Sequence, residues 1–182
     1  IGLLGGFDQK KADAITRQEE EIDLYEDKLG AFLVKLSSKE LSRKDSSQVS
    51  QLLHAIGDFE RIGDHAVNVL RVAHEIHDKE LHFSAKAQEE IAVITRAILD
   101  IMSLTVDAFA ANDEALAAKV EPLEQVIDGL KLELKNRHIR RLQEGRCTIE
   151  LGFVLTDLLT NYERVSDHCS NIAVTVIQVK DP

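Results

Sequence analysis

Aromatic residues and proline are scarce in this chain of 182 residues. Tryptophan is absent, proline occurs twice, and phenylalanine, tyrosine and tryptophan together make up 4% of the sequence. Strands favour aromatic and β-branched side chains, so this composition offers little to a β-sheet. Alanine, leucine, glutamate, lysine and isoleucine dominate instead, which favours helices. We therefore predict an all-α protein.

Cysteine and long apolar runs are also lacking. The two cysteines, Cys147 and Cys169, are too few for a disulfide framework or a thiolate zinc site. We expect both to be reduced thiols in a cytosolic protein. No run approaches the roughly 18 apolar residues of a membrane span, and residues 1–7 lack the basic region and cleavage site of a signal peptide. We expect neither a span nor an export signal in the chain.

Basic residues are fewer than acidic residues in this chain. The chain has 22 Lys and Arg residues against 32 Asp and Glu residues, a formal net charge of −10. Such a surface repels phosphate backbones and anionic lipid headgroups, so we expect no nucleic-acid partner. With 44% hydrophobic and 30% charged residues, the composition is that of an ordinary globular protein.

Apolar residues that recur three and four positions apart predict five helices, and short connections between them predict an antiparallel bundle. The expected ranges are 8–37, 46–76, 85–110, 113–142 and 149–178. Ser46 or Ser47 is the expected cap of the second helix, and Thr148 that of the fifth. Pro122 lies inside the fourth helix and should kink or restart it. Gly145 is expected to end that helix.

One nine-residue pattern occurs twice in the chain. Residues 60–68 read E-R-I-G-D-H-A-V-N, and residues 163–171 read E-R-V-S-D-H-C-S-N. Each copy places a glutamate and an aspartate four positions apart, on one face of a helix, where like charges repel. The preceding helix of each half carries another such pair. Single pairs of this kind arise by chance in so acidic a chain, but a duplicated arrangement indicates two similar sites.

If the helices meet at these faces, four carboxylates converge in each half. Oxygen ligands suit hard or borderline cations such as iron, manganese, magnesium or zinc. We therefore predict two metal sites: a first quartet of Glu19, Asp23, Glu60 and Asp64, and a second quartet of Glu124, Asp128, Glu163 and Asp167.

Two other interpretations of the acidic pairs stay open at this point: buried salt bridges to Arg61 and Arg164, or a solvated acidic face. His65 and His168 each follow the aspartate by one position, about 100° round the helix, so they could contribute only at the margin of a site. The other histidines show no ligand spacing and are expected at the surface; they are His54, His74, His77, His82 and His138.

The sequence gives little support to the hypothesis that the protein is an enzyme. Di-metal carboxylate enzymes need a glutamate three positions before a histidine, and no histidine here has one. No H-E-x-x-H motif and no phosphate-binding glycine loop occurs. We expect no enzyme activity. The main alternative to a metal-binding regulator is a metal-free helical scaffold whose acidic stripes dock a basic partner surface.

Residues 57–68 resemble the signature of the PhoU family, with G-D-F immediately before E-R-I-G-D-H. The second half, from V-E-P-L-E at position 120 to N-Y-E-R at position 161, resembles the PhoU-like tail of bacterial sodium/phosphate cotransporters. The resemblance covers nearly the whole chain from about Phe7. It implies a pair of three-helix bundles on the cytoplasmic side of the cell membrane, as the soluble tail of a membrane protein.

The resemblance further implies that the paired motifs bind metal ions, with iron, zinc or manganese as candidates, and that the domain modulates phosphate uptake. Its partner would be the transmembrane transporter domain of the same polypeptide, with a homo-oligomer left open. The expected repeats are residues 1–80, without an opening helix, and residues 81–182; residues 1–7 would be that helix's tail and the chain a fragment. Asp58 corresponds to Asn161. If that position tunes the site, the two sites should differ in charge and affinity.

Overall fold

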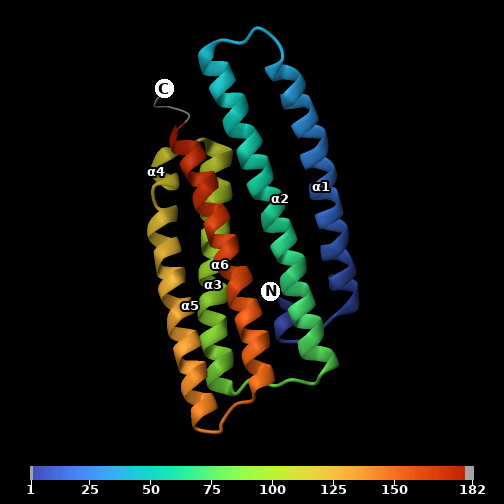
Figure 1. Cartoon of the computed structure of the whole chain (residues 1–182), viewed down its shortest axis with the longest axis vertical. Coiled ribbons are helices and arrows are strands. Elements are labelled where there is room, and N and C mark those ends of the chain that lie inside the picture. Colours follow the sequence, from blue (N-terminus) through green and yellow to red (C-terminus); the bar gives the residue numbers. More distant parts are fainter. Residues whose placement is uncertain (1, 179–182) are drawn as a thin grey trace.

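The computed structural model describes residues 2–178, which form an antiparallel bundle of helices (Figure 1). Its elements are η1 (Gly2–Leu4), α1 (Gln9–Ser37), α2 (Arg43–Asp78), α3 (Ala85–Ala111), α4 (Glu114–Ala117), α5 (Val120–Gln143) and α6 (Ile149–Gln178). No strand occurs within residues 2–178. The predicted all-α bundle is therefore confirmed.

The start of α2 corrects one predicted helix boundary. Ser42, rather than Ser46 or Ser47, caps this helix: its Oγ accepts a hydrogen bond from the Asp45 backbone N–H at 3.1 Å and donates one to the Asp45 carboxylate at 2.7 Å. Because Asp45 both donates a hydrogen bond to the Ser42 hydroxyl and accepts one from it, Ser42 is the better cap of the three serines. The helix therefore starts earlier than the apolar pattern indicates. At α6 the Thr148 cap is confirmed, with its Oγ1 accepting from the Leu151 N–H at 3.2 Å.

The predicted restart near Pro122 is also confirmed. α3 ends at Ala111, its C-cap Asn112 adopts the left-handed conformation with φ 48°, and Asp113 caps the single turn of α4. α5 then begins at Val120, so Pro122 falls in its first turn, where a missing N–H leaves no hydrogen bond unmade. Gly145, with φ +65°, follows the end of α5.

α2 and α6 lie side by side and antiparallel, with the most extensive contact in the molecule (Figure 1). α1 packs on α2 at one edge, while α5 and α3 pack on α6 and on each other. The largest fully buried side chains come mainly from the α3, α5 and α6 group; they include Ile94, Ile98, Ile101, Ile127, Leu158, Tyr162 and Ile172. The main core thus lies in the second half of the chain.

The α1–α2 hairpin is more exposed than the equivalent α5–α6 hairpin, because α3 covers only the latter. On α1, Leu29 is 46% exposed and Tyr25 64%. Leu134 lies 105 residues after Leu29, the same separation as that between Glu19 and Glu124, and it is 4% exposed in the main core. Within residues 2–178, no helix covers α1 and α2 as α3 covers α5 and α6. The division into repeats at residues 80 and 81 stays a prediction.

None of the helices in residues 2–178 is long and apolar enough to cross a membrane. Both cysteines are free thiols, Cys169 fully buried and Cys147 partly so.

His138 is buried, which contradicts its predicted surface position, while the other four histidines of that group are exposed. Its Nδ1 lies 3.5 Å from the Cys147 Sγ, and its Nε2 lies only 2.8 Å from the point where a Cβ at position 152 would be. Gly152 therefore leaves the space that the ring fills. This complementarity joins α5 to α6, and no spacing along one helix could reveal it.

We expect His138 to make the protein less stable in mild acid. Burial, and then the positive charge of Arg141, hold the pKa of His138 below its ordinary value of 6.5. The unfolded chain takes up a proton near that value, but the folded chain resists it, so stability is complete above about pH 6.5 and falls at lower pH, by at most about 1.4 kcal/mol per pH unit. Urea unfolding of the wild type and of His138→Gln between about pH 8 and pH 5.5 measures this. A flatter profile in His138→Gln supports the prediction, and exposed His54→Gln should leave the profile unchanged.

Candidate metal centre

The first quartet comes together between α1 and α2. Glu19 and Asp23 on α1 and Asp64 on α2 each offer one carboxylate oxygen, and these three oxygens all lie within 4.8 Å of one another. Glu19 and Asp64 are half-buried, whereas Asp23 is exposed. A single hard cation can contact three oxygens at this spacing after small rotamer changes, because such cations take flexible sets of oxygen ligands.

Gly63, in the middle of the duplicated motif, lies on the side of α2 that faces α1. A Cβ at this position would be 3.4 Å from the Ile22 Cδ1 and 3.9 Å from the Glu19 Cγ. The second half has Ser166 here, fully buried, with its Oγ donating a hydrogen bond to the Glu163 carbonyl at 2.8 Å. Both halves therefore have a small residue at this point of the duplicated motif.

The carboxylates of the first quartet destabilise one another's charge. Burial raises the pKa of Glu19 above its ordinary value of 4.5, and the charges of Asp23 and Asp64 raise it further. Burial likewise raises the pKa of Glu60, and the negative charge of Asp64 raises it further. Glu60 therefore belongs to the cluster electrostatically, although it is outside the group of three converging oxygens. A bound cation would offset this repulsion, so the donor set fits a metal ion.

The second quartet lies between α5 and α6, where burial raises the pKa of Glu124 and of Asp167, with further increases from neighbouring carboxylates. Here, however, the Lys131 ammonium forms an ion pair with Glu163. Within residues 2–178, these four carboxylates do not bring three ligand atoms within 4.8 Å of one another. Sequence reasoning missed Lys131 because it compared identical positions, and Lys131 matches Glu26 in the first half.

The two arginines of the salt-bridge interpretation are not buried. Arg61 is exposed. The Arg164 Nη1 lies 3.4 Å from the Asp167 Oδ2, but the Arg164 side chain is 60% exposed, so this pair contributes little stability.

A family model of the PhoU domain matches residues 3–73 and 91–176. The chain belongs to the PhoU family. This confirms the family resemblance of the duplicated motif. The finer resemblance, to the tail of a sodium/phosphate cotransporter, stays a prediction.

Two curated relatives carry the name phosphate-specific transport system accessory protein PhoU homolog. PhoU homolog 1 of Thermotoga maritima is 25% identical over 137 residues, covering 75% of this chain and 58% of the relative. The homolog of Xylella fastidiosa strain 9a5c is 25% identical over 175 residues, covering 93% of this chain and 71% of the relative. The chain thus spans only part of these proteins.

Solved PhoU structures share the fold. PhoU from Pseudomonas aeruginosa superposes with a TM-score of 0.87 at 23% identity, covering 96% of this chain and 83% of that chain. The PhoU regulatory protein from Streptococcus pneumoniae gives a TM-score of 0.80 at 17% identity, covering 94% of this chain and 79% of that chain.

In this PhoU chain, the motif histidines point across the α2–α6 contact rather than into their own quartets. The His65 Nδ1–H donates to the Asn161 Oδ1 at 2.9 Å, and the His168 Nδ1–H donates to the Asp58 Oδ1 at 2.8 Å. Their rings stack with centroids 5.7 Å apart. Asn171 also donates to Asp58, at 3.2 Å. The motif therefore has a structural role, joining α2 to α6, besides the role of its acids.

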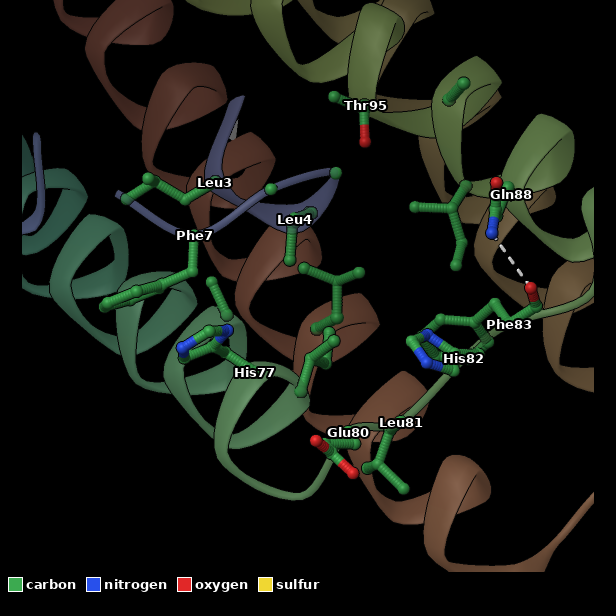
Figure 2. Close-up of a pocket in the computed structure, with 17 residues that line it drawn as sticks. Leu3, Leu4, Phe7, His77, Glu80, Leu81, His82, Phe83, Gln88 and Thr95 are labelled. Carbon is green, nitrogen blue, oxygen red and sulfur yellow. Dashed lines mark hydrogen bonds between the residues drawn. The ribbon is translucent and has the colours of Figure 1, made fainter. Parts of the chain in front are cut away.

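A separate cavity of about 570 Å³ lies among η1, the end of α2 and the start of α3 (Figure 2). Its wall includes Leu3, Leu4, Leu81 and Phe83, and the one hydrogen bond drawn there joins the Gln88 side chain to the Phe83 carbonyl, at 2.9 Å. This PhoU cavity shares no residue with either quartet.

Proposed function

We propose that this chain is the regulatory PhoU domain of a sodium-dependent phosphate transporter and that its first quartet binds a metal ion. The accessory-protein names of the relatives support a role in phosphate transport. The resemblance of the second half to cotransporter tails supports a fused transmembrane partner in the same polypeptide, with this domain on the cytoplasmic side. Regulation, rather than metalloenzyme catalysis, fits a sequence that has no H-E-x-x-H motif and no glutamate three positions before a histidine.

The observation that supports metal binding is the convergence of Glu19, Asp23 and Asp64 within 4.8 Å. These ligands come from two consecutive helices, so a bound ion would hold α1 against α2. It would also relieve the repulsion that raises the pKa of Glu19. Iron, manganese and zinc all suit such a donor set. The metal state of the hairpin would then be the signal that the domain passes to the transporter.

The deciding experiment is metal analysis of the chain purified without an affinity tag. Elemental mass spectrometry, after exposure to iron, manganese and zinc salts in turn, should find metal in the wild type. Asp23→Asn with Asp64→Asn removes two of the three converging ligands, so we expect affinity to fall by about tenfold or more with unchanged helix content. The control is Asp27→Asn with Asp107→Asn, which makes the same charge change at exposed positions outside both quartets.

A wild type that stays free of all three metals would contradict the proposal. It would favour the metal-free scaffold that docks a basic partner surface. Equal metal loss in the control would show that net charge, and not the quartet, retains the ions.

A further inference from the structure

The helix faces that carry the two quartets differ in charge at a neighbouring position that the duplication makes equivalent. Along α1 and α5 the acidic residues match at an offset of 105, as Glu19 matches Glu124, and the same offset pairs Glu26 with Lys131. Each of these two residues lies one turn after the aspartate of its helix, on the acidic face. The second quartet therefore carries an ammonium group where the first half carries a carboxylate.

The partner of this position is the glutamate of the neighbouring helix in both halves. Lys131 forms its ion pair with Glu163, and the two side chains are only 26% and 28% exposed. Glu26 and Glu60, the equivalent residues, line one cleft between α1, α2 and α6. The second half thus pairs a cation with an acid, whereas the first half has an acid at the equivalent position, in a cleft that Arg61 also lines.

An ammonium group is a compact, strongly hydrated point charge with three donors, so it can serve carboxylates much as a small metal ion does. Arg164 adds a second cation beside Asp167. A metal ion entering the second quartet would have to displace Lys131 from Glu163 and would then lie close to a like charge. The residues of the second quartet therefore do not fit the metal that the family resemblance implies.

We infer that Lys131 takes the place of a metal ion in the second quartet, which binds none, and that Glu26 adds to the affinity of the first quartet. The inference about Glu26 rests on the proposed function of the first quartet. The inference about Lys131 does not rest on it, since it concerns only the ion pair that Lys131 forms in the second quartet. Of the two quartets, the one in the α1–α2 hairpin then binds a metal ion. In the other, Lys131 balances part of the negative charge.

Reciprocal substitutions at the two equivalent positions test this. Manganese and zinc content is measured by elemental mass spectrometry, and Mn²⁺ and Zn²⁺ affinity by isothermal titration calorimetry. In the wild type we expect Asp128→Asn with Asp167→Asn to leave metal content unchanged. Lys131→Glu should add a second bound ion, which Asp128→Asn with Asp167→Asn then removes. Glu26→Lys should weaken the first site by at least about tenfold. Lys135→Glu, an exposed lysine of the same helix, is the matched control.

Lys131→Gln covers the case in which the reversed charge disturbs folding, and circular dichroism reports helix content for each variant. Metal in the wild type that depends on Asp128 and Asp167 would overturn the inference. So would Lys131→Glu and Lys131→Gln proteins that fold but gain no ion. A wild type without metal whose Lys131→Glu variant binds one ion would support the inference while refuting the proposed function of the first quartet.

Discussion

Replacing Arg141 with alanine is expected to lower the free energy of unfolding by about 3 kcal/mol, because it removes the nearer of two charged donors from a buried carboxylate. Glu90 on α3 is 8% exposed, and its Oε2 accepts a hydrogen bond from the Arg141 Nη1 at 2.8 Å. Arg141 is itself 13% exposed. The other donor to Glu90, Arg137, is 42% exposed and its Nη1 lies 3.3 Å from the Glu90 Oε1, so we expect it to compensate only weakly.

Urea unfolding followed by circular dichroism measures this loss. Arg137→Ala is the matched control on the same helix, one turn earlier, and should cost about 1 kcal/mol or less because that side chain is partly solvated and also pairs with Glu133. Glu90→Leu with Arg141→Met removes both charges and should recover most of the stability. Equal losses in the two single arginine variants would show that Glu90 does not depend on Arg141.

Helix periodicity and the duplicated motif predicted most of the architecture in this chain. The range of α6 and the restart before Pro122 followed from local rules of capping and proline geometry. The α2 start was missed because three nearby serines could each cap a helix, and only the reciprocal bond with Asp45 distinguishes Ser42. Local patterns thus locate a helix better than they locate its first residue.

The site was harder to predict, because its chemistry depends on positions where the two halves differ. The matching acids indicated two equivalent clusters, but Lys131 and Glu26 are opposite in charge at one shared position. Such differences carry no periodic signal. The burial of His138 was missed for a related reason, since it depends on the absent side chain of Gly152 on another helix.

The crossed histidine contacts show how the duplication builds the centre of the fold. His65 and His168 are equivalent positions, and each bonds to the residue equivalent to the other's partner, Asn161 and Asp58. This reciprocity is what a pseudo-two-fold axis between α2 and α6 requires. The contact is symmetric in geometry but not in chemistry, because a carboxylate stands on one side and an amide on the other.

Asp58→Ala is accordingly expected to cost about 2 kcal/mol of unfolding free energy, and Asn161→Ala about 1 kcal/mol. Asp58 is 15% exposed and accepts two hydrogen bonds from α6, from His168 at 2.8 Å and from Asn171 at 3.2 Å, so its loss leaves two donors without their partner. Asn161 accepts one hydrogen bond across the helices, from His65, and its Nδ2 donates to the Asp157 carbonyl of its own helix.

Urea unfolding near neutral pH compares the two variants with Asp58→Asn, which makes the equivalent positions chemically identical. We expect Asp58→Asn to fall between the wild type and Asp58→Ala, because an amide oxygen can still accept from His168 but without the strength of a charged acceptor. Equal losses for Asp58→Ala and Asn161→Ala would mean that the carboxylate adds nothing to the α2–α6 contact. A larger loss at Asp58 would mean that one half of the duplicated motif has become the stronger link between α2 and α6.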